Sequence, residues 1–491
     1  MNRWSIAAGA ALILAAAPHR AAGQNPAPAP AAGDTLALSL DGAVTRALGE
    51  SDEIRLARSE VGLANAEVRA TRAQALPQLN ANLGYTRTFA SPFGGGGGIT
   101  LPDSLGFSPD STASLAARVS YLERNAANAG LAGLGSLFSG LPFGQENTYT
   151  ATLSGSQTLF SGGRTGAALR IARHYRSAAE LTLQERQADI ALQVRTAYTQ
   201  AQLARELEEI ARAALEQAEA FLQQERLRQR AGESSDLEVL RAEVSRDNLR
   251  PQLVQAENAA QLAELELKRL LNIPSGQPLR LTTRLEAPDV AVATADAAAA
   301  TAGRAALAAA ERQAAIREEG IRIARGAFLP TVSVQAHYGR QLQPSTMFGF
   351  GETWRGDAAA SLNVSVPLFS GGQRTAELQT ARLEAERARL QLAQLREGVQ
   401  VEYEQARGEA ERARTAIAAR QTTVQAAQRV HDLTVLRYQR GLATQLEVSQ
   451  SRLELLQARS NLAQAIADLR IAGARLERAT GTATPSAGSA D

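Results

Sequence analysis

The sequence predicts a mixed α and β chain, built as an internal duplication that joins long antiparallel helical hairpins to pairs of short strands. The segment LFSGG occurs at residues 159–163 and again at 368–372, and each copy opens a long stretch without proline. Each stretch reaches a turn at a glycine, Gly232 or Gly441. The second copy follows the first by 209 residues at both landmarks, 368 against 159 and 441 against 232. Two arms of equal length indicate a repeated unit whose length is itself specified.

The composition of the arms favours helix throughout. They are dominated by Ala, Leu, Gln, Glu and Arg, the residues that lose least free energy on entering a helix. A helix of about 65 residues extends roughly 100 Å. Apolar residues in the second arm recur at steps of three and four, the seam of a coiled coil, at Leu392, Leu395, Val399, Tyr403, Ala406, Ala410, Ala413 and Ile417. The pattern resumes after each turn, so each arm is expected to fold back as a hairpin. For the arms alone, an ordinary scaffold coiled coil is an equally good interpretation.

Four segments alternate apolar and polar residues with a period of two, which predicts strands at 77–89, 148–160, 330–340 and 358–369. Each has about the ten-residue length of a tilted transmembrane strand, with uncharged polar residues on one face and aromatic residues near one end. Four strands cannot close a barrel, and an open edge leaves backbone groups without partners in a bilayer. The chain is therefore expected to oligomerise, with the polar face lining a lumen. A soluble sandwich is the alternative.

The ends of the chain suggest export. Arg3, an apolar run at residues 6–17 and small residues up to Gly23 predict a secretory signal peptide at residues 1–23, too short to span a membrane. Residues 24–37 and 481–491 are expected to be a disordered linker and a disordered tail. Without cysteine, disulfide and thiolate chemistry are excluded. The formal net charge of +2 argues against nucleic-acid binding.

No enzymatic chemistry is predicted. Outside the signal peptide the histidines are His174, His337 and His431, and they lack the spacing of metal ligands. No glycine-rich loop that could hold a phosphate is followed by Lys and Ser or Thr, so any energy must come from a partner. The many acidic residues of the arms fit solvated helix faces better than paired catalytic carboxylates. We therefore expect no catalytic, metal or cofactor site.

The whole mature chain resembles the TolC-like outer-membrane efflux proteins, the outer membrane factors. The resemblance rests on the order and spacing of several segments: LSLDGAVTRAL at 38–48, the Leu-Pro pairs at 76–77 and 329–330, both LFSGG turns, and LNIP at 271–274. It implies a homotrimer with a twelve-stranded transmembrane β-barrel in the bacterial outer membrane lipid and a helical tunnel in the periplasm. It also implies docking to a periplasmic adaptor protein and to an inner-membrane pump of the RND, ABC or MFS type.

The resemblance implies a passive exit duct of a tripartite efflux pump or of a type I secretion system. The alternative is a structural trimeric coiled-coil spacer or adhesin of the cell envelope without transport. Whether drugs, metal ions or proteins are exported, and which class of pump is the partner, is left open by the sequence.

This organisation predicts two repeats. The first, 38–272, holds a helix, two strands and a hairpin at 164–272 with its tip near residue 232; the second, 299–480, holds the same parts with a hairpin at 373–480 and its tip near residue 441. Residues 273–298 connect the repeats in the equatorial region. Two surface loops are expected, at 90–147 and 341–357. The first is long and glycine-rich, and it is either a mobile extracellular cap or plug or a low-complexity insertion without function.

The tips are the expected adaptor-docking surface. They centre on Gly232 and Gly441, which can turn the backbone sharply, with Arg230 and Arg440 beside them. The resemblance implies that the tips and the grooves between them receive the adaptor. The alternative is that the glycines serve the turns alone.

The family resemblance also implies a periplasmic gate close to the tips. The family's acidic position six residues after each tip glycine is matched by Glu238 and Glu447, and its tyrosine before the second tip by Tyr438, whose hydroxyl could donate to Glu238. Two positions depart from the family: its latch arginine is Ala443 here, and a second acidic position is Gln450. Closure is therefore expected to rest on Tyr438 and on helix packing, while three copies of Glu447 would favour cations.

The alternative is that both glutamates are surface residues near a helix N-terminus, where a carboxylate is favoured in any case. Whether the gate is closed at rest is left open.

Overall fold

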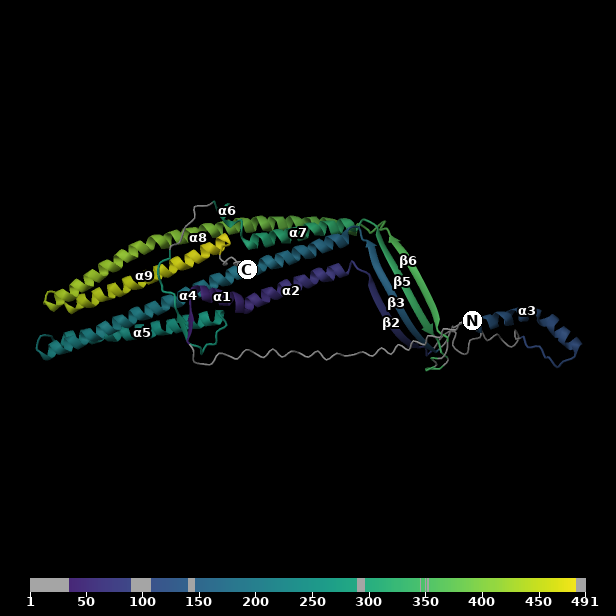
Figure 1. Cartoon of the computed structure of the whole chain (residues 1–491), viewed down its shortest axis with the longest axis horizontal. Coiled ribbons are helices and arrows are strands. Elements are labelled where there is room, and N and C mark those ends of the chain that lie inside the picture. The colour runs from purple at the N-terminus through teal and green to yellow at the C-terminus, as the bar shows by residue number, and fades with distance from the viewer. Residues whose placement is uncertain are drawn as a thin grey trace, which may run out of the picture.

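A computed structural model describes residues 35–89, 107–139, 146–288, 296–344, 346–348, 350 and 353–482. The expected signal peptide lies outside these residues, as do most of the linker, most of the tail, and parts of the first surface loop and of the connector. Two helical hairpins extend from one end of a β-sheet, and both tips lie at the end of the molecule farthest from the sheet (Figure 1). Across the described residues, no helix combines the length and the apolarity needed to cross a membrane.

The elements form two similar series. The first comprises β1 (Leu36–Leu38), α1 (Leu40–Glu50), α2 (Asp52–Ala73), β2 (Gln78–Arg87), α3 (Leu115–Ser139), β3 (Asn147–Phe160), α4 (Arg164–Arg230) and α5 (Asp236–Leu270). The second comprises β4 (Leu279–Leu281), α6 (Ala297–Thr301), α7 (Ala305–Gly326), β5 (Thr331–Leu342), β6 (Arg355–Ser365), α8 (Gln373–Gln439) and α9 (Gln445–Thr480). The long helices α4 and α8 have 67 residues each, and α2 and α7 have 22 each. The duplication therefore extends to the lengths of the elements.

The hairpins pair α4 with α5 and α8 with α9, and α4 also contacts α9. The expected seam of α8 faces inward in large part, because five of its eight positions are buried: Val399, Tyr403, Ala406, Ala410 and Ile417. Alanine at such positions lets helix backbones approach closely. The returning helices have only 35 and 36 residues. The N-terminal half of α4, which is nearer the sheet, packs instead against α2 and α7.

The main hydrophobic core lies partway along α4, where α1, the end of α5 and a short parallel pair of strands meet. Ile54, Val194 and Leu267 are buried there. The hydroxyl of Tyr198 donates to the carbonyl oxygen of Leu38 at 2.9 Å and fixes β1 against α4. The expectation of disorder up to residue 37 is wrong for its last residues, because β1 pairs with β4 and Leu38 enters this core.

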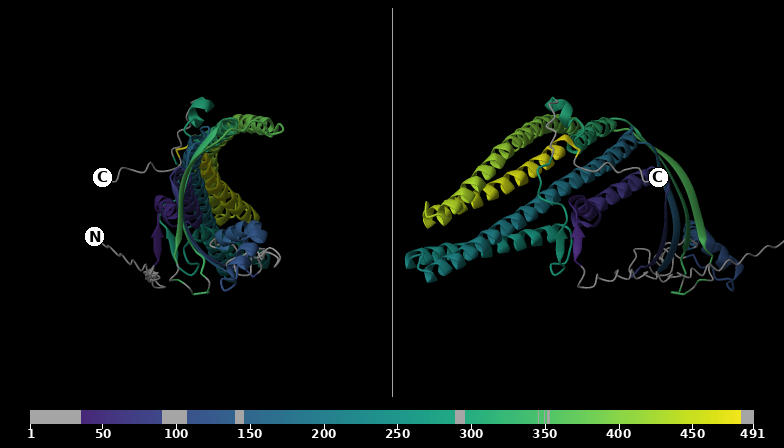
Figure 2. Two further views of the ribbon diagram at one scale, coloured as in Figure 1. Left: turned by 90° about the vertical axis from the view of Figure 1, so that its right-hand side faces the viewer. Right: turned by 60° about the vertical axis from the view of Figure 1, so that its left-hand side comes forward.

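The four longer strands form one antiparallel sheet in the order β2-β3-β5-β6. It is strongly curved, and seen along the long axis the described chain resembles an open crescent (Figure 2). Every residue of the two edge strands, β2 and β6, is exposed. Because β2 and β6 stand at the two ends of this order, the backbone groups along their outer sides have no strand partner within the described part of the chain.

The strand pairing repeats with the sequence. Gln78 pairs with Ser156, and adding 253 and 209 to these numbers gives Thr331 and Ser365, which are also paired. The value 253 is the distance between the Leu-Pro pairs at 76–77 and 329–330, and 209 is the distance between the LFSGG segments. The two strand hairpins of the sheet thus share one register. The pairing of β3 with β5 therefore predicts how β6 of one copy would pair with β2 of another.

The helices meet the sheet at a close glycine contact. Gly162 has φ of +67°, and a Cβ added there would lie 2.4 Å from the carbonyl oxygen of Gly326 at the end of α7. A Cβ on Gly326 would lie 2.6 Å from the carbonyl oxygen of Gly162. Gly371, the same position in the second repeat, has φ of +61° with nothing within 4 Å. Only glycine therefore allows the backbones of the first junction to touch.

The surface loops differ from expectation in two ways. Residues 115–139 of the first loop form the helix α3, which lies beyond the sheet at the end opposite the hairpin tips (Figure 1). Asn125 interrupts it with a non-helical φ of −116°. The last strand begins at Arg355 rather than at residue 358, because Gly356 and Asp357 already pair with β5.

Candidate functional site

The hairpin tips turn at the two predicted glycines. Gly232 has φ of +80° and Gly441 has φ of +73°, a region that side chains rarely adopt, and neither has an atom within 4 Å of where a Cβ would be. Arg230 is the last residue of α4, and Arg440 caps the end of α8. Leu442 beside the second glycine is 65% exposed. The tips thus present basic and apolar side chains at the free end of the molecule.

Tyr438 joins the two hairpins close to these turns, on the side nearer the sheet. Its hydroxyl, at the end of α8, donates to a carboxylate oxygen of Glu238 in the first turn of α5 at 3.1 Å. Tyr438 is buried. The structure therefore brings together Tyr438 and Glu238, which are 200 residues apart in sequence, as the sequence suggested. Their role in a gate stays a prediction.

The ring of Tyr438 belongs to a stack of aromatic rings and arginines from both hairpins. The ring of Phe221 in α4 lies 5.6 Å from it, and the guanidinium of Arg228 lies 5.2 Å from its centre. Arg452 of α9 lies 5.3 Å from the ring of Phe221. Burial raises the pKa of Tyr438 above its usual value, and the carboxylates of Glu225 and Glu238 raise it further. The phenol therefore stays protonated at neutral pH and acts as a donor.

Glu225 is a member of this cluster that sequence reasoning missed. It is fully buried on α4, although glutamate is rarely buried without partners. The buried residues Ala214, Ala218 and Leu222 precede it at helical spacing. A charged residue at a position of that buried seam is the sequence signal that could have identified it.

Glu447 has a different environment. Its carboxylate accepts a hydrogen bond from the backbone N–H of Thr444 at 2.6 Å, and its own N–H donates to the Thr444 hydroxyl, which completes a capping box. The Thr444 backbone and hydroxyl hold the pKa of Glu447 below its usual value. Gln450, one turn later, donates to Glu454 at 3.3 Å. The hydrogen bonds of the Glu447 and Gln450 side chains are thus made to their own helix and its cap.

Two substitutions separate the cap from the charge of Glu447. Glu447→Gln keeps an oxygen that can accept from Thr444, whereas Glu447→Ala removes both the cap and the charge. If three copies of Glu447 line a narrow opening, the cation-to-anion permeability ratio in planar bilayers should fall toward one in both variants. A trivalent cation on the tip side should block wild type more strongly than either. If Glu447→Gln keeps the cation selectivity and the trivalent-cation block of wild type, Glu447 serves only as a capping residue.

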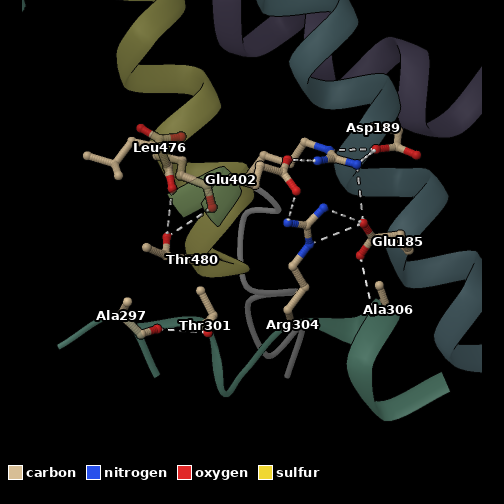
Figure 3. Close-up of polar contacts among 11 residues, drawn as sticks. Glu185, Asp189, Ala297, Thr301, Arg304, Ala306, Glu402, Leu476 and Thr480 are labelled. Carbon is tan, nitrogen blue, oxygen red and sulfur yellow. Dashed lines mark hydrogen bonds and ion pairs between the residues drawn. The ribbon is translucent and has the colours of Figure 1, made fainter. Parts of the chain in front are cut away.

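The second notable cluster lies where α4, α7, α8 and α9 meet (Figure 3). Arg304, only 4% exposed, donates to Glu402 of α8 at 2.6 Å and to Glu185 of α4 at 3.1 Å. Glu185 also accepts from the backbone N–H of Ala306 in the first turn of α7. Arg478 of α9 bonds Asp189 of α4 at 2.6 Å and also contacts Glu402. Burial opposes the charge of Arg304, but Glu402 and Glu185 outweigh it and raise its pKa. The cluster fastens four helices at one level.

The described residues hold no group of three or more His, Asp or Glu side chains placed to bind a metal. His337 bonds Asp357 at 2.9 Å on the sheet, and His431 bonds the Ser451 hydroxyl between α8 and α9 at 3.0 Å.

Comparison with known proteins decides the family. The model of the family described as "Outer membrane efflux protein" matches residues 110–272 and 285–482, which is more than half of the chain. The chain belongs to this family.

Relatives of this outer membrane efflux protein are distant in sequence. It is 28% identical over 259 residues to Protein CyaE of Bordetella pertussis (strain Tohama I), an alignment that covers 51% of this chain and 53% of CyaE. The chain thus spans about half the length of that curated relative.

Solved structures share the fold of the efflux protein almost end to end. The outer membrane protein VceC of Vibrio cholerae matches with a TM-score of 0.68 at 20% identity over 90% of this chain and 96% of VceC. The open state of the MtrE outer membrane channel of Neisseria gonorrhoeae matches with a TM-score of 0.70 at 18% identity over 90% and 88%. At these identities the likeness concerns the fold alone.

Proposed function

We propose that this efflux protein is the exit duct of a tripartite efflux pump or of a type I secretion system. Copies of the chain would close their sheets into one β-barrel in the outer membrane, and the helical hairpins would form a tunnel in the periplasm. Substrates would pass through it without chemical change, driven by an inner-membrane pump that reaches the tips through a periplasmic adaptor.

The observation that carries this proposal is the sheet with two fully exposed edges. Its strands have 10, 14, 12 and 11 residues, about the length that crosses a bilayer when tilted. Inside a bilayer the unpaired backbone groups of β2 and β6 need partners, and a second copy is the natural source. Since one chain supplies four strands, three copies give the twelve-stranded barrel that the family resemblance implies.

The shared register supports closure by identical copies. Within the chain Leu153 pairs with Tyr338 where the two strand hairpins meet. Applying the repeat distances of 209 and 253 to this pair gives Leu362 and Tyr85, one on each free edge. Leu362 is 65% exposed and Tyr85 41% exposed, so both are available for pairing with another copy.

The hairpins support the tunnel. A helix of 67 residues extends about 100 Å, far more than a bilayer requires. Their surfaces interleave arginine with glutamate, and α5, α8 and α9 each expose leucines, such as Leu240, Leu433 and Leu446, that neighbouring copies could cover.

Planar bilayer recording tests the proposal. Purified protein should insert from one side and give long-lived conductance steps of uniform size, because a spacer or adhesin has no reason to contain an open lumen. Protein lacking residues 146–160, which include β3, serves as the control and should give no steps. Absence of conductance from correctly assembled oligomers of both wild type and the Tyr438→Phe variant, which loosens the contact between the tips, would contradict the duct.

A further inference from the structure

The buried carboxylate of Glu225 connects the first tip turn to the contact between the hairpins. It accepts a hydrogen bond from the hydroxyl of Ser234, in the turn between α4 and α5, at 2.9 Å. It also accepts from the guanidinium of Arg228, one turn along α4, at 3.3 Å. The position of the turn is therefore fixed by a charge that lies inside the hairpin.

The same carboxylate is linked to Tyr438 of the other hairpin through Arg228. The phenol hydroxyl donates to Glu238 at 3.1 Å, and the carboxylate of Glu225 adds to the rise in the pKa of Tyr438. Arg228 binds Glu225 and also stacks on the Tyr438 ring. Glu225 and Arg228 thus contact both the tip turn and the residue that joins the hairpins.

Burial makes these contacts interdependent. A carboxylate removed from water is costly unless hydrogen bonds satisfy it, and here its donors come from the turn, through Ser234, and from α4, through Arg228, which also lies over the ring of Tyr438. Losing the Ser234 donor leaves the buried charge short of one partner. The side chains around Glu225 are then expected to shift so that water reaches the carboxylate, and Tyr438 is one of those side chains.

We propose that Glu225 is a positioning residue that couples the conformation of the first tip turn to the Tyr438 contact between the hairpins. A displacement of the turn that withdraws Ser234 weakens the hold of Tyr438, so a force applied at the tip is transmitted to the seam between the hairpins. As regulation of the duct, this inference rests on the proposed function.

The experiment compares the open probability of single channels for Ser234→Ala, Glu225→Gln and Ser234→Thr with wild type. Because a hydrogen bond to a buried charge is among the stronger ones, Ser234→Ala and Glu225→Gln should raise open probability about tenfold. Ser234→Thr, which keeps the hydroxyl, should stay within about twofold of wild type. Arg226→Gln is the matched control: it breaks the 2.6 Å pair between Arg226 and Glu243 in the same hairpin, a pair that includes none of Glu225, Ser234 and Tyr438, and should also stay within about twofold.

A double-mutant cycle decides whether the turn acts through Tyr438. In a Tyr438→Phe background, Ser234→Ala should have little further effect, because the contact it controls is already lost. If the double variant instead raises the open probability by the product of the two single-variant factors, the coupling is overturned.

Hydrogen exchange at residues 436–439 of α8 provides a readout that needs no conduction. Ser234→Ala should speed exchange there, and Arg226→Gln should not. Unchanged exchange in Ser234→Ala would overturn the inference even if the channel conducts as proposed. Faster exchange in a protein that does not conduct would uphold the coupling and reject the duct.

Discussion

Gly162→Ala is expected to reduce the yield of assembled protein severely and to lower the temperature at which the purified oligomer dissociates. Alanine at a φ of +67° costs about 1–2 kcal/mol on conformational grounds alone. The new Cβ would also meet the carbonyl oxygen of Gly326 at 2.4 Å, where backbone must move and overpacking adds about 1–3 kcal/mol. The loss falls where the helices are joined to the sheet.

Gly371→Ala is the matched control, since it carries the same left-handed cost at a φ of +61° with open space around it. Its effect should be the smaller one by both measurements, outer-membrane yield and dissociation temperature in mild detergent. Equal losses in the two variants would mean that the Gly162 contact relaxes without cost and that only the turn conformation matters.

A cysteine pair at Leu362 and Tyr85 is expected to link copies covalently under mild oxidation. Residues directly opposite on antiparallel strands have Cα atoms about 4.5–5.5 Å apart, within the range of a disulfide. The protein has no cysteine of its own, so the background is clean. Because β2 and β6 lie at opposite edges of the sheet within one chain, any disulfide formed must join two copies.

Denaturing gels without reductant should show a ladder that ends at a closed, fully linked species, which the family resemblance expects to be the trimer. The control pairs Leu362→Cys with Gly84→Cys, whose Cβ vectors point to opposite faces at this register, and it should link poorly. Stronger linking by the control than by the designed pair would show that the register between copies differs from the register within the chain.

Much of the fold could be predicted because its long elements carry strong periodic signals. The seam through Val399, Tyr403 and Ala406 has helical spacing, and the four strands alternate over ten residues or more. The short strands β1 and β4 were missed, since three residues are too few for a period and their pairing joins segments more than 240 residues apart. The helix α3 was missed because glycine-rich sequence favours a loop.

The site was predictable only in part. The contact of Tyr438 with Glu238 was suggested by the family pattern, and the structure has it at 3.1 Å. Glu225 was missed although its position in a buried seam is a sequence signal, and Arg304, the residue before α7, is one basic residue among many and carries no such signal. What distinguishes them is burial, with exposures of 0% and 4%, and burial depends on which helix faces which. The capping box at Glu447 was within reach, because Thr444 precedes it by three residues.

The equality of α4 and α8, each 67 residues long, restricts how such a chain can change over time. A residue inserted in only one of them would advance that tip by about 1.5 Å and rotate every later side chain by about 100° around the helix. In a closed assembly the two kinds of tip would alternate around the axis, so a single insertion would leave a rim of uneven height for any partner to seat on. A change in tunnel length is therefore tolerated only if it occurs in both repeats and adds or removes a number of residues that returns the apolar seam to the same helix face. Insertions and deletions in the two long helices are expected to occur in matched pairs.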